Sequence, residues 1–220
     1  MNKFFSVLLL AVLTAGYAQA QFTFGARAGL NLSNISLTYD GKNDGEDPYK
    51  FKPGIQLGIV GEYAISDNLA IQPGILFSQM GFKQEASFMD YYSMKTSCTM
   101  NYLQIPVNVQ YKLDLGGMNL LLQAGPYFGY GLGGKMKWEF TEDGVTEKDD
   151  EKVEFGNDPE IHFCKALDFG LGVGAGLQFN NLQIGLGYNF GLANLSNYDD
   201  DKFKIKNNGL ALTVTFLFGK

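Results

Sequence analysis

The stretch Leu167-Asp168-Phe169-Gly170-Leu171-Gly172-Val173-Gly174-Ala175-Gly176-Leu177-Gln178-Phe179 alternates apolar residues with glycine along its length. Its odd positions are all apolar, and its even positions are glycines except for Asp168 and Gln178 near the two ends. A period of two is typical of a β-strand, because successive side chains of a strand point to opposite faces. The stretch therefore predicts a strand with two very different faces.

Eight stretches of the chain alternate in this way, and together they predict a closed barrel. The predicted strands are 22–33, 53–65, 69–83, 102–114, 119–135, 167–179, 182–192 and 209–218. Short turns near Asp67, Gly116 and Asn180 alternate along the chain with long loops over 34–52, 84–101, 136–165 and 193–208. This asymmetry is expected of outer-membrane barrels. The pattern predicts an all-β fold, namely an eight-stranded antiparallel up-and-down transmembrane β-barrel with both chain ends on the short-turn side.

The start of the chain has the features of a cleaved signal peptide. Met1-Asn2-Lys3 is a short positive start, residues 4–15 are apolar, and Ala18-Gln19-Ala20 is a small-x-small cleavage site. The alternative is an N-terminal transmembrane helix, but only about a dozen residues are continuously apolar, against the roughly 20 that such a helix needs. We therefore expect residues 1–20 to be removed and residues 21–220 to form one exported barrel domain.

Composition favours strands and turns over helices. The 220 residues include 28 Gly, 18 Phe and 12 Tyr, and this length suits a single all-β domain. The formal net charge is −6, and loss of Lys3 with the signal peptide removes one positive charge and makes it −7. An acidic protein has no electrostatic reason to bind nucleic acid, so this class of partner is excluded.

The two strand faces distinguish a membrane barrel from a soluble one. One face consists of Leu, Ile, Val and Phe and suits hydrocarbon, whereas the other holds Gly, Gln, Asn and Tyr and suits a narrow, hydrogen-bonded lumen. The alternative, a soluble barrel or sandwich, would carry many charged residues on its outer face. Arg27 and Glu62 lie on the polar face of adjacent predicted strands and are a candidate pair across the lumen. We interpret them as part of a structural plug, because eight strands enclose too narrow a space for a channel.

Three segments carry a resemblance to a known family. Gly25-Ala26-Arg27-Ala28-Gly29-Leu30-Asn31, Tyr102-Leu103-Gln104-Ile105-Pro106-Val107 and Gly174-Ala175-Gly176-Leu177-Gln178-Phe179, behind a signal peptide, resemble the outer-membrane β-barrel domain common in Bacteroidetes, the porin-family or PorT-like group. The resemblance covers essentially the whole mature chain and implies a barrel rather than a particular activity. PorT-like members are associated with a secretion system for exported proteins. Many outer-membrane barrels end on an aromatic residue, whereas here Gly219-Lys220 follow Phe218.

Cys98 and Cys164 are the only cysteines, and each precedes a strand that starts on the long-loop side. Export through an oxidising compartment permits a disulfide between them, which would tie the second long loop to the third. The alternative is a pair of free thiols, because the two strands are not neighbours and a disulfide needs Cα atoms within about 7 Å.

The only histidine, His162, lies in a setting that does not predict catalysis. The serines of the loop 84–101 are on another predicted loop, and no nucleophile motif surrounds them. Residues 40–45 resemble a calcium loop weakly, because Lys42 and Phe51 stand where ligand oxygens are needed. We therefore predict no enzyme activity, no cofactor and no metal site.

The third predicted long loop is strongly acidic. It has ten acidic residues and, between the first and the last of them, only the lysines Lys148 and Lys152. The ten are Glu139, Glu142, Asp143, Glu147, Asp149, Asp150, Glu151, Glu154, Asp158 and Glu160. A second acidic run is Asp199-Asp200-Asp201. Such a run is either solvated chain or a surface that attracts divalent cations or an extracellular ligand.

The sequence as a whole predicts a monomeric, non-enzymatic outer-membrane barrel in contact with membrane lipid. The function expected is structural, or binding and recognition through the long loops, because loops on a rigid scaffold commonly carry recognition. One alternative is a transport role, as a narrow pore or an accessory of protein export. A lipid-modifying enzyme is a weaker alternative, because the sequence does not indicate a catalytic triad of Ser, His and a carboxylate.

Overall fold

The computed structural model describes residues 22–40, 49–88, 92–158, 160–197 and 202–218. The predicted signal peptide (1–20), most of the calcium-like segment (40–45), the acidic run 199–201 and the chain end Gly219-Lys220 lie outside these residues. In the described part there is no helix long and apolar enough to cross a membrane.

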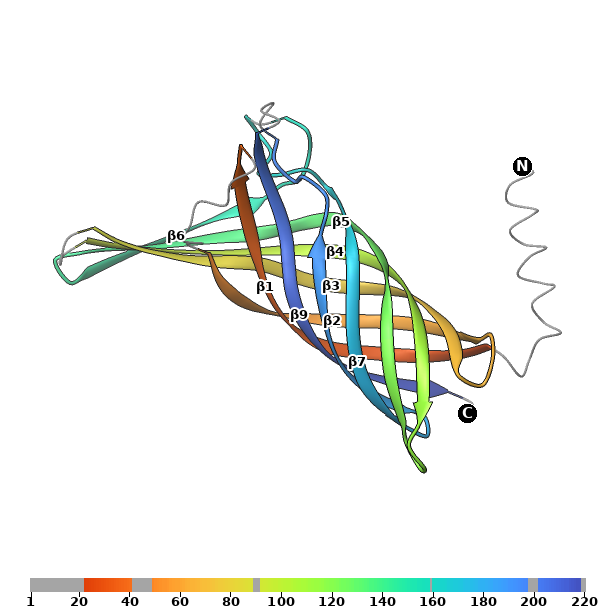
Figure 1. Cartoon of the computed structure of the whole chain (residues 1–220). Helices are drawn as coiled ribbons and strands as arrows, with labels where there is room; N and C mark the ends of the chain where they lie inside the picture. Colours follow the sequence, from red (N-terminus) through yellow and green to blue (C-terminus); the bar gives the residue numbers. More distant parts are fainter. Residues whose placement is uncertain (1–21, 41–48, 89–91, 159, 198–201, 219–220) are drawn as a thin grey trace.

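The described chain consists of antiparallel strands, and eight of them close into a barrel (Figure 1). The strands are β1 (Phe22–Tyr39), β2 (Tyr49–Ala64), β3 (Leu69–Phe88), β4 (Tyr92–Asp114), β5 (Asn119–Glu142), β6 (Val145–Val153), β7 (Leu167–Phe179), β8 (Leu182–Gly191) and β9 (Phe203–Phe218). The ring runs β1-β2-β3-β4-β5-β7-β8-β9, and β1 pairs with β9 to close it. The remaining strand, β6, pairs only with β5 among the described residues. The predicted eight-stranded up-and-down barrel is confirmed, with one further strand outside the ring.

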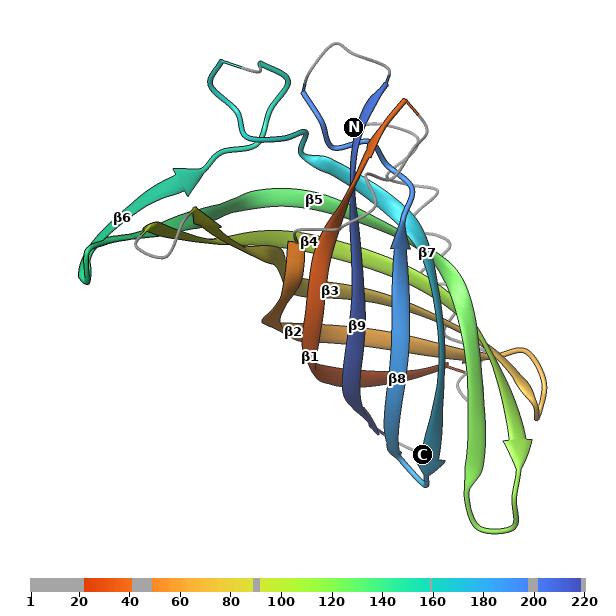
Figure 2. The same ribbon diagram turned by 60° about the vertical axis from the view of Figure 1, so that its left-hand side comes forward.

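The three short turns join strands at the end of the barrel near the C-terminus (Figure 2). Asn180 and Asn181 form the two-residue turn between β7 and β8, since Phe179 pairs with Leu182. Asn180 has a φ of 50°, a conformation that asparagine tolerates better than most residues and that tight hairpins require.

The polarity of the two barrel faces is as predicted. Leu30, Phe128 and Leu186 point away from the lumen and are exposed, as is expected of side chains that face lipid. Arg27 and Gln110 point inward and are buried. The apolar face is therefore the membrane wall, and the glycine-rich face lines the interior.

The predictions of long loops over 84–101 and 136–165 are wrong. β3 runs on to Phe88, β4 starts at Tyr92, β5 reaches Glu142, and β6 occupies Val145–Val153. These strand ends form a four-stranded sheet that leaves the barrel wall and projects to one side (Figure 1). We call this the outer sheet: residues 81–88 of β3, 92–101 of β4, 133–142 of β5 and all of β6. The ends of the loops 34–52 and 193–208 are also strand, since β1 extends to Tyr39 and β9 begins at Phe203.

The outer sheet was missed because its strands exchange the polarity of their faces. On β4 the outward positions change from Leu103 and Ile105 to Thr99 and Ser97, while the inward positions become apolar at Met100. β1, β3 and β9 make the same exchange, each keeping its period of two. Their outward polar residues above the apolar band are Asn34, Ser36, Gln79, Lys83, Lys204, Lys206 and Asn208. The exchange marks where the strands leave the membrane, because an outward polar face is suited to water.

A β-bulge in β5 lies at this boundary. Tyr102 pairs with Gly131 and Asn101 with Gly133, so Leu132 is an extra residue on β5. Gly133 has a φ of 130°, which a residue with a side chain rarely adopts. Above the bulge the inward positions of β5 become Met136 and the alternate residues after it, which continue the inner face of the outer sheet.

Candidate functional site

The lumen contains a hydrogen-bonded network around a buried ion pair. Lys112 Nζ lies 2.6 Å from Glu62 Oε1, and the two side chains are 8% and 1% exposed. The other Glu62 oxygen accepts a hydrogen bond from Gln183 Nε2 at 2.9 Å. Gln72 Nε2 donates to Gln183 Oε1 at 3.1 Å, and Arg27 Nη2 donates to Gln72 Oε1. The network satisfies the buried charges, which would otherwise be costly to hold away from water.

Arg27 and Glu62, the candidate lumen pair, are thus two members of one network, with Gln72 and Gln183 between them. The role of Lys112 as the partner of Glu62 could not be read from the sequence. β2 and β4 are not neighbours in the ring; both pair with β3, and the two side chains meet over the lumen face of that strand.

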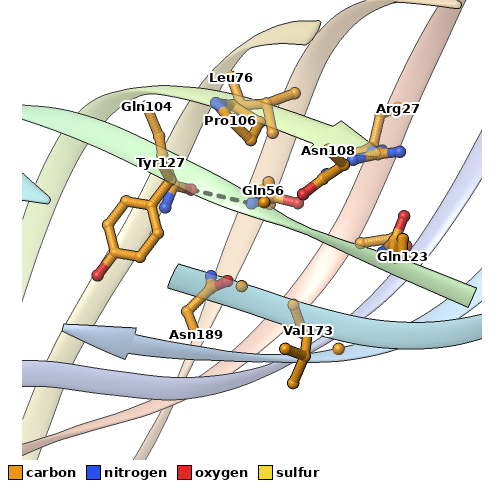
Figure 3. A pocket seen from close by; sticks show the side chains of 15 residues that line it. Arg27, Gln56, Leu76, Gln104, Pro106, Asn108, Gln123, Tyr127, Val173 and Asn189 are labelled. Carbon is orange, nitrogen blue, oxygen red and sulfur yellow. Dashed lines mark hydrogen bonds between the residues drawn. The ribbon is translucent and has the colours of Figure 1, made fainter. Parts of the chain in front are cut away.

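The lumen cavities are small. The cavity in Figure 3 has a volume of about 50 Å³, and its wall includes Arg27, Gln56, Gln104 and Tyr127. Gln56 Nε2 donates to Gln104 Oε1 at 3.3 Å across it. A second lumen cavity has about 10 Å³. Such volumes hold a few water molecules at most, so the interior is a filled polar core.

Two loops, described over 154–158 with 160–166 and over 192–197, pack into the outer mouth of the barrel, and backbone hydrogen bonds tie them together. Lys165 N donates to Leu195 O at 2.9 Å, and Leu195 N donates to Ile205 O of β9 at 2.9 Å. Cys164 and Leu195 are each 1% exposed. They belong to a buried apolar cluster with Ile35, Met80, Phe82, Cys98, Met100, Tyr102, Val153 and Ala193. This cluster, the mouth plug, separates the polar lumen from the outside.

A larger cavity lies outside the mouth plug, and we call it the outer cavity. Its volume is about 450 Å³. Its lining is mostly apolar and comes from β1, β2, β3, β4, β5 and β9 and from the two loops: Ile35, Leu37, Tyr49, Phe82, Gln84, Met94, Thr96, Met136, Trp138, His162, Phe163, Asn197, Phe203 and Ile205. A cavity of this size and character is typical of small-molecule sites.

Five of the ten acidic residues of the segment 139–160 divide between the two faces of the outer sheet. On the outer face Asp150 Oδ2 lies 2.7 Å from Lys135 Nζ, and Glu139 Oε1 lies 2.8 Å from Lys148 Nζ. On the inner face β6 places three acids opposite three apolar residues of β5. The cross-strand pairs are Glu151 with Met136, Asp149 with Trp138 and Glu147 with Phe140. Residues directly opposite on antiparallel strands share a face, so an acidic column borders an apolar one.

The remaining predicted acids lie around the β5–β6 turn and after β6. Tyr92 Oη donates to Glu142 at 2.6 Å, and this contact raises the pKa of the Tyr92 phenol. Asp143 and Gly144 form the turn, with φ angles of 46° and 81°. An Asp-Gly pair is a common hairpin-turn signal, and it could have indicated a hairpin at this place in the sequence. The other three acids, in the described part of the segment after β6, are Glu154, Asp158 and Glu160.

A second cavity, the acidic cavity, adjoins the outer cavity. Its volume is about 210 Å³. Its lining is Met136, Trp138, Glu151, Lys152, Val153, Glu154, Glu160, Ile161, His162 and Phe163. Met136, Trp138, His162 and Phe163 line both cavities and so form a shared wall. The acidic cavity has three carboxylates and one ammonium in its wall, and it therefore favours cations.

Cys98 and Cys164 are both buried in the mouth plug, and their sulfurs are unbonded in this structure. They come from β4 and from the segment before β7, so the fold brings the two predicted partners into one cluster. Burial raises the pKa of each thiol to about 12. The disulfide stays a prediction.

We expect these thiols to resist alkylation in the folded protein. A pKa of about 12 in place of 9 lowers the thiolate fraction near pH 8 by about a thousandfold. Mass spectrometry after maleimide treatment at pH 8 should show no label on the folded barrel. After denaturation without reductant, two labels indicate free thiols and no label indicates the disulfide. Rapid labelling of the folded barrel would contradict the burial of both residues.

His162 forms part of the wall of both the outer cavity and the acidic cavity. Its Nδ1 accepts a hydrogen bond from Asp158 N at 3.3 Å, and its backbone oxygen accepts one from Asn197 Nδ2 at 3.0 Å. In the described ranges there is no group of three or more His, Cys, Asp or Glu residues placed to hold a metal ion.

The chain is similar to known proteins both in sequence pattern and in structure. No curated protein sequence matches the chain. Among solved structures, the chain is similar to Neisserial surface protein A (13% identity, 88% of this chain and 96% of that chain, TM-score 0.41). It is also similar to the outer membrane protease OmpT from Escherichia coli (12%, 89% and 97%, 0.41) and to Ail of Yersinia pestis (16%, 89% and 99%, 0.33). A family model for the outer membrane protein beta-barrel domain matches residues 17–197. This chain belongs to that family of outer-membrane β-barrel proteins.

Proposed function

We propose that this outer-membrane barrel is a non-enzymatic, monomeric recognition protein that binds an extracellular ligand in the outer cavity. The observation that carries the proposal is the exchange of polarity along the strands above the membrane. An apolar inner face in water is costly unless something covers it, and large exposed apolar surfaces commonly mark binding sites. The outer cavity lies where this face meets the mouth plug.

The filled lumen supports different roles for the barrel and for the outer sheet with its two loops. The barrel supplies a rigid base, and the outer sheet and the two loops supply the binding surface. Of the partner classes predicted from the acidic segment, we retain the extracellular ligand, because the acids of the inner face adjoin a cavity. Export through the predicted signal peptide and a place in the PorT-like group of Bacteroidetes are part of the same proposal, and the three resembling segments support them.

Shortening the outer sheet should abolish binding without affecting the barrel. Replacing residues 138–149 by Asn-Gly joins Lys137 to Asp150, a pair already opposite each other, through a tight turn. We expect saturable binding of the apolar dye N-phenyl-1-naphthylamine, measured by fluorescence above the lipid background, to fall at least about tenfold, because the cavity wall at Trp138 is removed.

The matched control replaces only residues 142–145 by Asn-Gly. It trims the tip of the same hairpin and leaves every residue of the outer cavity in place. This variant should bind the dye like the parent protein, and both variants should keep the heat-sensitive gel mobility of a folded barrel. Full dye binding by the longer deletion contradicts the proposed site.

A pore is the second candidate, and the lumen argues against it. The ion pair of Glu62 and Lys112 and the mouth plug both lie across the path. We therefore expect planar-bilayer recordings of the purified protein to show no discrete conductance steps, since the lumen cavities among the described residues have only about 50 and 10 Å³. Reproducible steps that scale with protein concentration would establish the pore instead.

A further inference from the structure

We propose that the ligand is a hydrophobic cation, with its apolar body in the outer cavity and its cationic group at the wall shared with the acidic cavity. This inference rests on the proposed function and names the chemical class of its ligand. Three features of the described residues support it: an apolar volume, an excess of carboxylates beside it, and aromatic rings between the two.

The apolar volume suits a chain or ring system of small-molecule size. The outer cavity of about 450 Å³ falls within the range of ligand pockets. Its lining contains no Lys, Arg, Asp or Glu side chain, and its polar members are Gln84, Thr96, His162 and Asn197. The body of the ligand is therefore apolar, because a charge in this cavity would lose its hydration with little to replace it.

The charge of the ligand follows from the acidic cavity. Glu151, Glu154 and Glu160 line it, against the single ammonium of Lys152. Lys152 pairs with Lys135 across the strands and so belongs to the outer face of the outer sheet, whereas Glu151 belongs to the inner face. Opposite charges across a site favour binding and suppress ligands of the wrong sign. An anionic amphiphile would meet these carboxylates and is disfavoured.

The wall between the two cavities suits a cation. Trp138 and Phe163 line both cavities. The faces of aromatic rings attract cations, and tryptophan does so most strongly. A cationic group at this wall is attracted by the faces of the rings and by the carboxylates, while the rest of the ligand lies in the outer cavity.

One polar anchor is also available. The Oδ1 atom of Asn197, a residue of the outer cavity, is buried, and the described residues offer it no hydrogen-bond donor. A buried acceptor without a donor is costly. A ligand that carries an N–H group could satisfy it, so a protonated amine is favoured over a quaternary ammonium group of the same size.

The single tryptophan supplies a direct reporter. Trp138 is the only tryptophan of the chain, so 5-fluorotryptophan gives one ¹⁹F resonance from the shared wall. We would titrate the full protein in lipid nanodiscs with octylammonium, octyltrimethylammonium or octanesulfonate below their micelle concentrations. The three probes share one apolar body and differ in the head group. We expect both cations to shift the resonance saturably, with octylammonium tightest and with an affinity about tenfold or more above that of octanesulfonate.

Two paired variants test the charges. Glu151→Gln with Glu160→Gln removes two carboxylates from the acidic cavity and should reduce the preference for cations to about threefold or less. Asp67→Asn with Asp143→Asn removes the same charge from two exposed turns and should leave the preference intact. That pattern supports the proposal.

Two other outcomes overturn it in different ways. If octanesulfonate binds as tightly as the cations and the carboxylate variant changes nothing, the cavity binds ligands but the class is wrong. If none of the three probes shifts the resonance of Trp138, the outer cavity is not a binding site, and the proposed function fails with it.

Discussion

Alanine in place of Gly170 is expected to prevent the barrel from closing, whereas alanine in place of Gly172 is expected to be tolerated. Both glycines lie on the lumen face of β7. A Cβ atom at Gly170 would lie 2.1 Å from the carbonyl oxygen of Phe190 and 2.7 Å from the ring of Tyr127. The first of these atoms is backbone of β8, which cannot yield without separating two paired strands. At Gly172 the nearest atom is Asn189 Oδ1 at 2.8 Å, the end of a flexible side chain.

Semi-native gel mobility with and without boiling measures the difference. The parent protein and Gly172→Ala should migrate as a compact species that shifts on heating. Gly170→Ala should lose most of that species, because overpacking against backbone cannot be relieved by a change of rotamer. Equal amounts of the compact species in the two variants would show that close approach at Gly170 does not determine barrel closure.

This comparison shows how far the alternation predicts the structure. The row of glycines in 167–179 predicts a strand with a narrow inner face, and the period of two predicts its partners' faces as well. It does not distinguish Gly170 from Gly172. That difference depends on the neighbouring strands. The backbone of β8 and the ring of Tyr127, directly opposite on β5, crowd Gly170, whereas Gly172 meets the side chain of Asn189, directly opposite on β8.

The outer sheet was predictable as strand, but the cavities that it borders were not. Met94, Thr96, Cys98 and Met100 alternate with polar residues, so the period of two continues through 92–101. The prediction failed because only strands with an apolar outer face were expected. Above the membrane the outer face meets water, so it is polar and the inner face is apolar.

The candidate site depends on pairings that no local pattern contains. The count of ten acids in 139–160 is evident from the sequence. Which acids are neutralised is decided by the register from the Asp143-Gly144 turn, which places Asp150 beside Lys135 and Glu151 on the opposite face. The outer cavity also needs Phe203 of β9 and Tyr49 of β2, which come together only when β1 pairs with both strands.

Replacing Lys112 by methionine is expected to destabilise the barrel by about 3–5 kcal/mol, the usual cost of leaving a buried charge without its partner. Glu62 would keep the hydrogen bond from Gln183 but lose the ammonium at 2.6 Å, while its side chain is 1% exposed. The measurement is the free energy of unfolding in lipid vesicles, from a urea titration followed by gel mobility. Lys50→Met, which breaks the exposed pair of Lys50 with Glu85, is the control and should leave the unfolding midpoint unchanged.

The double variant Glu62→Gln with Lys112→Met decides what the ion pair contributes. It removes both charges and keeps an oxygen at position 62 to accept from Gln183, so most of the lost stability should return. In that case the pair adds little net stability, and its effect is to penalise any register in which Glu62 of β2 and Lys112 of β4 do not meet over the lumen face of β3. If the double variant is as unstable as Lys112→Met, the attraction between the two charges is itself a main source of stability. The first result is expected, because desolvation of two charges offsets most of their attraction in a buried site.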